Sequence, residues 1–137
     1  MGTWGHRSFE NDGALDWVAE LEVDGVDAIR DALTAITDSG GGEYIDVDDA
    51  CFAVAAAEVV AAARGHGPEG LPDEIVDWLD DSASSVTVPD AVLARKAVAR
   101  VRENSELQEL WGENGSENDW DREMASLLAR LAAAAAA

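Results

Sequence analysis

Four side chains in the first half of the sequence could act together as an acid–base site: His6, Asp12, Asp16 and Glu58. A histidine can accept a proton near neutral pH, and a neighbouring carboxylate can orient its ring. Other mechanisms have less support, because no Ser or Cys lies in a nucleophile elbow and no glycine-rich loop leads into a helix with the Lys that phosphate binding requires. A small metal-dependent or hydrolase-like enzyme is therefore one hypothesis, and it requires that these four side chains meet in space.

Metal-binding patterns are weak. His6 and His66 are the only histidines, and neither has a second His or Cys at the spacing of a zinc site. The acidic run 46–49 resembles the start of a calcium loop, but Cys51 occupies the position where the sharp turn needs glycine. Carboxylates in the first turn of a helix are favoured by the helix dipole without any metal. We expect neither a bound metal nor a cofactor.

Glu58 is the one charge between Asp49 and Arg64 in a run that is otherwise apolar. Burying a carboxylate without partners is unfavourable by several kcal/mol, so the fold must supply hydrogen-bond donors or let the side chain reach water. The donors that we expect are in the amino-terminal leader, namely the Trp4 indole, the Arg7 side chain and nearby backbone amides.

The chain is strongly acidic, with 29 Asp and Glu against 9 Lys and Arg and a net charge of -20 over 137 residues. Nucleic acid is a poor partner, because binding to phosphates depends on clustered Lys and Arg, and the sequence has no such cluster. A basic protein is the better candidate. Adaptation to salt and simple solubility remain alternative explanations, because high ionic strength screens the repulsion between surface carboxylates.

Trp111 and Trp120 flank the acidic loop 112–118. Tryptophan is common at the energetic centres of protein interfaces, so the two rings, with Glu113 and Asp119, are candidates for a partner-binding patch. The alternative is that both rings pack in the core, as we expect for most of the five tryptophans.

Capping residues and apolar spacings of three and four predict an all-α fold. Asp24 is the expected cap of the second helix, and Pro89 is expected to open the fifth. We expect an irregular orthogonal bundle of six or seven helices around a central alanine-rich helix, with helices near residues 12–22, 24–36, 47–64, 72–81, 89–101, 105–111 and 119–131.

The length suits one domain over residues 1–137. Trp4 and Phe9 predict that residues 1–10 form an ordered leader docked on this domain, whereas the alanine-rich end, 132–137, is expected to fray. A lone buried Cys51, the absence of a signal-peptide pattern and an apolar run too short for a bilayer predict a cytoplasmic protein that does not bind membranes.

Several segments, in order along nearly the whole chain, resemble the bacterial domain of unknown function family 4259. The resemblance implies a small soluble protein and carries no reaction, cofactor or catalytic residue. The matching segments are Gly2-Thr-Trp-Gly5 with Phe9, Asn11, Asp12, Ala14, Asp16 and Trp17, then Tyr44-Ile-Asp46, residues 56–61, Ser105-Glu-Leu with Glu109-Leu-Trp111, and Trp120.

Taken together, these patterns favour a non-enzymatic protein-binding module, of the inhibitor or immunity type, for a basic partner. The enzyme hypothesis based on the His/Asp/Glu cluster is the alternative. Oligomeric state is left open by the sequence.

Overall fold

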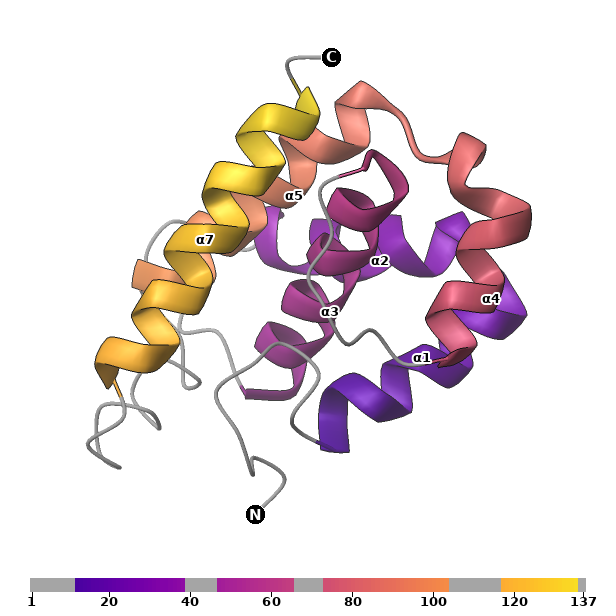
Figure 1. The fold of residues 1–137 in the computed structure, drawn as a ribbon. Coiled ribbons are helices and arrows are strands. Elements are labelled where there is room, and N and C mark those ends of the chain that lie inside the picture. Colours follow the sequence, from indigo (N-terminus) through magenta and orange to yellow (C-terminus); the bar gives the residue numbers. More distant parts are fainter. Residues whose placement is uncertain (1–11, 39–46, 66–72, 104–116, 136–137) are drawn as a thin grey trace.

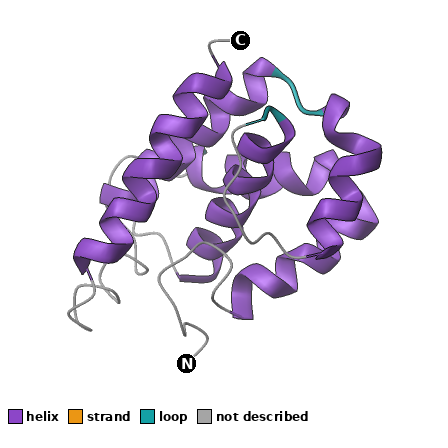
Figure 2. Cartoon of the chain, viewed as in Figure 1, coloured by secondary structure: helices purple, strands orange, loops and turns teal. Residues whose placement is uncertain are grey.

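The computed structural model describes residues 12–38, 47–65, 73–103 and 117–135, and all of its regular structure in these ranges is helical (Figures 1 and 2). The all-α prediction is confirmed. The elements are α1 (Asp12–Asp24), α2 (Val26–Thr37), α3 (Val47–Ala63), α4 (Asp73–Ser82), the 3-10 turn η1 (Ala83–Ser85), α5 (Val88–Glu103) and α7 (Glu117–Ala135).

Helix α3 is the centre of the bundle, as its composition predicts. Residues 53–61 are all buried, because this stretch of the helix is apolar on every side apart from Glu58. Its many alanines allow neighbouring helices to approach closely, and α3 contacts each of the other five described α-helices. Figure 1 shows α3 enclosed by these helices.

The surrounding helices are amphipathic to different degrees. In α2, Ile29, Leu33 and Ile36 lie on one buried face at spacings of four and three residues. In α4 only Ile75 is fully buried, while Trp78 and Leu79 pack partly against the core. Helix α4 therefore lies at the periphery and exposes most of its acidic side chains.

The junction between α1 and α2 differs from the prediction. Asp24 ends α1 instead of capping α2, and Gly25 occupies the N-cap position without a side-chain cap. The Gly25 backbone has φ 64° and ψ -136°, and its amide donates to the Leu21 carbonyl at 2.8 Å. The turn between the two helices requires a residue with a positive φ. Glycine adopts this φ freely, whereas an aspartate at the same position would be strained.

Replacing Gly25 with alanine should lower the free energy of unfolding by about 1–3 kcal/mol, because an L-residue is strained at this φ and ψ. Urea unfolding measures the change. The control is Val23→Ala, at a position that is 83% exposed, where we expect a change within about 0.5 kcal/mol. Equal stability of the two variants would show that the junction can rearrange to tolerate a side chain.

Helix α5 begins with a capping arrangement that the sequence prediction did not include. The amide and the hydroxyl of Thr87 both donate to Asp90 Oδ2, at 2.9 and 3.1 Å. Pro89 is the second residue of the helix, where its missing N–H is harmless, so the expected opening is correct to within one residue.

The last described turn of α7 packs against the bundle. Helix α7 continues to Ala135 and buries Ala134, and the fraying expected for residues 132–137 stays a prediction. The Arg64 Nε donates to the Ala134 carbonyl at 3.0 Å, satisfying a carbonyl that the helix end leaves open. The leader 1–10 and the helix expected at 105–111 lie outside the described residues.

Candidate functional site

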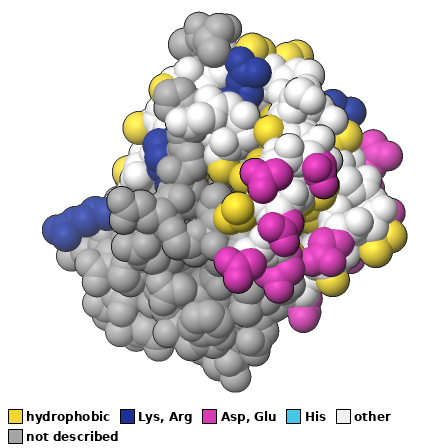
Figure 3. Space-filling view, turned by 45° about the vertical axis from the view of Figure 1, so that its right-hand side comes forward, with side chains coloured by type: hydrophobic (Ala, Val, Ile, Leu, Met, Phe, Trp, Pro, Cys, Tyr) yellow, Lys and Arg dark blue, Asp and Glu magenta, His cyan; other side chains and the backbone are white. Residues whose placement is uncertain are grey.

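The exposed carboxylates of α1 and α4 form what we call the acidic surface. Helices α1 and α4 contact each other, so their charges belong to one part of the molecule. Figure 3, which turns the α4 side of Figure 1 forward, shows Asp and Glu side chains grouped together, with the visible Lys and Arg side chains apart from them. The acidic surface consists of Asp16, Glu20, Glu22, Asp24, Asp73, Glu74, Asp77, Asp80 and Asp81.

Basic side chains are scarce in this half of the chain and serve internal contacts. Between residues 8 and 94 the sequence has only Arg30 and Arg64. Arg30 binds Asp90 of α5, and Arg64 binds the end of α7. The exposed carboxylates of α1 and α4 consequently have no lysine or arginine within their own helices.

Helices α2 and α5 are joined by two arginines. Arg30 donates through Nε and Nη2 to the two oxygens of Asp90, at 2.9 and 3.2 Å. At the other end of α2, Arg100 donates from Nη1 to the Ile36 carbonyl at 3.1 Å. One ion pair and one bond to a helix-terminal carbonyl therefore fix this pair of helices.

Helices α3 and α7 are joined in the same manner. Arg130 donates from Nη1 and Nη2 to the two Glu58 oxygens, at 3.0 and 2.9 Å, while Arg64 binds the Ala134 carbonyl. The Glu58 side chain is 1% exposed and that of Arg130 is 19% exposed. The prediction that Glu58 is supplied with donors is confirmed, with Arg130 as the described donor. The predicted donors Trp4 and Arg7 lie outside the described residues.

The charges on Asp90 and Arg30 support each other. Burial raises the pKa of Asp90, but the hydrogen bonds from Arg30 and Thr87 outweigh it, so that the pKa lies below its ordinary value. The hydrogen bond and charge of Asp90 in turn raise the pKa of Arg30. Asp90 is therefore a structural carboxylate that stays ionised.

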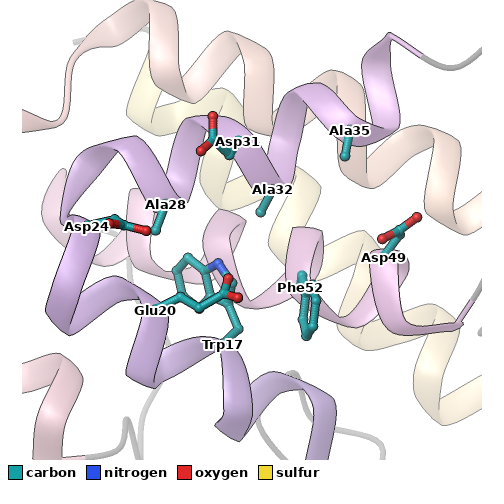
Figure 4. A pocket seen from close by; sticks show the side chains of 9 residues that line it. All are labelled: Trp17, Glu20, Asp24, Ala28, Asp31, Ala32, Ala35, Asp49 and Phe52. Carbon is teal, nitrogen blue, oxygen red and sulfur yellow. The ribbon is translucent and has the colours of Figure 1, made fainter.

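A pocket of about 170 Å³ lies between α1, α2 and α3 and adjoins the acidic surface (Figure 4). Alanines and two aromatic rings supply its apolar walls, and carboxylates surround them. The lining residues are Trp17, Glu20 and Asp24 from α1, Ala28, Asp31, Ala32 and Ala35 from α2, and Asp49 and Phe52 from α3.

Trp17 has an unusual place in this wall. Its side chain is 1% exposed, yet the indole Nε1 has no hydrogen-bond partner among the residues that the structure describes. In Figure 4 the nitrogen edge of the ring is turned toward the space among the lining residues. A buried donor without an acceptor is unfavourable by about 1–3 kcal/mol. Unfavourable local features of this kind are expected at functional sites.

The residues of the predicted acid–base site are only partly described. Asp16 is exposed on α1, whereas Glu58 is buried and paired with Arg130. His6 and the Asp12 side chain lie outside the described residues. Among the residues that are described, no three His, Cys, Asp or Glu side chains are grouped so as to hold a metal ion.

The predicted partner-binding residues lie outside the described part of the structure. Trp111 and Glu113 are outside the described ranges, as are the side chains of Asp119 and Trp120 in α7. These four residues remain a prediction.

Sequence reasoning expected most of the five tryptophans in the core but missed the role of Trp17 in the pocket, because only the crossing of α1, α2 and α3 brings the lining together. It also missed Asp90, for which a signal was present. The spacing Thr87-x-x-Asp90 is that of a capping box with Asp in place of Glu.

Comparison with known proteins gives one match. The family model described as a domain of unknown function (DUF4259) matches residues 2–123. No curated protein and no solved structure matches the chain. Across the part of the chain that the structure describes, every helix is too short or too polar to cross a bilayer.

Proposed function

The chain belongs to the DUF4259 family, a membership that supplies no reaction, and from its charge distribution we propose that it is a non-enzymatic module that binds a basic protein. An inhibitor or immunity-type role fits this proposal. The observation that carries it is the acidic surface of α1 and α4, whose two helices contain no basic residue.

The positions of these carboxylates favour recognition over helix stability. Glu22 and Asp24 lie in the last turn of α1, and Asp80 and Asp81 lie in the last turn of α4. Negative charge at a helix C-terminus opposes the helix dipole and is locally unfavourable by about 0.3–1 kcal/mol per group. Residues that oppose a local stability rule without compensation are expected at functional surfaces.

A basic partner would gain from this arrangement in two ways. Grouped carboxylates raise the rate of encounter with an oppositely charged protein, and binding relieves the repulsion among them. The proposed interaction must therefore weaken as salt is added, because the Debye length falls from about 10 Å at 0.1 M to about 3 Å at 1 M.

The test compares two variants with the same change of net charge. Asp77→Asn, Asp80→Asn and Asp81→Asn together neutralise part of the acidic surface, whereas Val92→Lys, Ala129→Lys and Ala133→Lys add three charges at exposed positions of α5 and α7. The wild-type protein and both variants are immobilised and exposed to a lysate of the cells that naturally produce the protein, in about 50 mM KCl. We expect a basic protein to be retained by the wild type and the lysine variant and lost by the asparagine variant.

Retention of no basic protein, or equal loss from both variants, would overturn the proposal. The asparagine variant should be at least as stable as the wild type, since it removes carboxylates from a helix C-terminus. A thermal melt of all three proteins therefore shows that loss of binding does not come from unfolding.

Salt adaptation gives a different expectation for the protein alone. If the charge serves only to suit a salty medium, the melting temperature must rise as potassium chloride increases to molar concentration. A level or falling melting temperature counts against that explanation and leaves recognition as the stronger one.

A further inference from the structure

The pocket between α1, α2 and α3 shares Glu20 and Asp24 with the acidic surface. We propose that this pocket receives an arginine side chain of the basic partner. The inference rests on the proposed function and specifies how the partner is held.

The size of the pocket selects a ligand of one side chain. Its volume of about 170 Å³ is close to that of an engineered cavity, about 150 Å³, that holds benzene. Sites for drug-sized molecules and cofactors occupy about 300–1,000 Å³. A single long side chain matches this volume.

The chemistry of the walls selects a side chain with an apolar stem and a positive end. Ala28, Ala32 and the Phe52 ring offer an apolar surface for methylene groups. Glu20 and Asp31 come from different helices, and Figure 4 shows them on different sides of the pocket. A guanidinium has five donors in one plane, so it can bind carboxylates on several sides at once, and its flat face can stack on an aromatic ring. An ammonium is a compact point charge, so arginine suits these walls better than lysine does.

The Trp17 ring reports on the occupant of the pocket without bonding to it. The indole Nε1 is buried and has no hydrogen-bond partner among the described residues, and a guanidinium has no acceptor to offer it. The stem of the arginine therefore lies along the apolar wall that includes the Trp17 ring, while the guanidinium lies among the exposed carboxylates.

The test is a titration of ¹⁵N-labelled protein with the capped peptide Gly-Arg-Gly, monitored at the indole N–H signals. Trp17→Phe identifies the Trp17 signal by its loss. We expect that signal to move with saturation in the millimolar range, more weakly with Gly-Lys-Gly, and not with a peptide containing norleucine, which has the stem without the charge. No movement with the arginine peptide, or equal movement with norleucine, would overturn the proposal.

Two pairs of matched variants locate the binding. Glu20→Gln and Glu22→Gln make the same charge change at exposed positions of α1, but only Glu20 lines the pocket. We expect Glu20→Gln to weaken peptide binding about threefold or more and Glu22→Gln to change it little. Ala35→Leu fills the pocket from an exposed position and should abolish the shift, whereas Ala129→Leu on α7 should not. Equal effects within either pair would contradict the assignment.

The outcome is separable from that of the proposed function. The asparagine variant used above changes only α4 residues, none of which lines the pocket. If a basic protein is captured but the Trp17 signal does not respond to the arginine peptide, the pocket assignment fails and the proposed function stands. If the peptide binds but no basic protein is captured, the pocket assignment stands and the proposed function fails.

Discussion

Replacing Arg130 with methionine is expected to lower the free energy of unfolding by about 3–5 kcal/mol, the largest effect that we expect from a single substitution in this chain. The Glu58 carboxylate is 1% exposed and accepts two hydrogen bonds from Arg130, at 2.9 and 3.0 Å. Methionine retains most of the stem that packs between α3 and α7 but removes both donors and the positive charge. Urea denaturation followed by far-ultraviolet circular dichroism measures the loss.

A double-mutant cycle separates the ion pair from the packing. Glu58→Met should be less harmful than Arg130→Met, because the Arg130 side chain is 19% exposed and can turn toward water. The double variant should recover much of the stability lost in Arg130→Met, since two apolar side chains can replace a buried pair at little net change. We expect a coupling energy of about 2 kcal/mol or more between the two sites.

Arg122→Met provides the control for this cycle. Arg122 is exposed on the same helix, and we expect its replacement to change stability by no more than about 0.5 kcal/mol. An Arg130→Met variant as stable as Arg122→Met would mean that the Glu58 ion pair does not hold α7 to the central helix.

The central helix illustrates what the sequence can predict. Residues 50–63 are apolar on all sides apart from Glu58, and burial on every face is the arrangement that satisfies such a segment in water. The charge within it likewise predicts a partner for Glu58. The identity of that partner did not follow, because Arg130 lies 72 residues further along the chain and only the crossing of α3 and α7 brings the two together.

The candidate site was predictable only in its general character. Composition predicts an acidic surface, and the scarcity of Lys and Arg predicts that few of its charges are neutralised. The grouping of Glu20, Asp24 and Asp31 around Trp17 depends on how α1 turns into α2. That turn is made by Gly25 at a positive φ, whereas the sequence pattern predicts a helix start capped by Asp24.

Asp90 carries the second large expected effect. Replacing it with alanine should lower the free energy of unfolding at neutral pH by about 2–3 kcal/mol, because its carboxylate accepts hydrogen bonds from both Thr87 groups and from Arg30. Arg30→Met should have a smaller effect, about 1 kcal/mol, since the Arg30 side chain is 44% exposed and the Thr87 donors remain. An effect of Arg30→Met as large as that of Asp90→Ala would show that the ion pair, and not the cap, is the main contribution.

The pH dependence gives Asp90 a signature that packing alone does not produce. Its pKa in the folded protein is lowered, so the unfolded chain binds the proton more readily than the folded one. The stability contributed by the charge is therefore complete above the pKa of the unfolded chain, about 3.9, and is lost as the pH falls through the lower folded value. The stability difference between the wild type and Asp90→Ala should be constant from neutral pH to about pH 5 and should shrink below about pH 4. Because the two proteins differ at Asp90 alone, subtracting the two profiles isolates the contribution of this side chain. A difference that stays constant into that acidic range would mean that the side chain contributes through its shape and not through its charge.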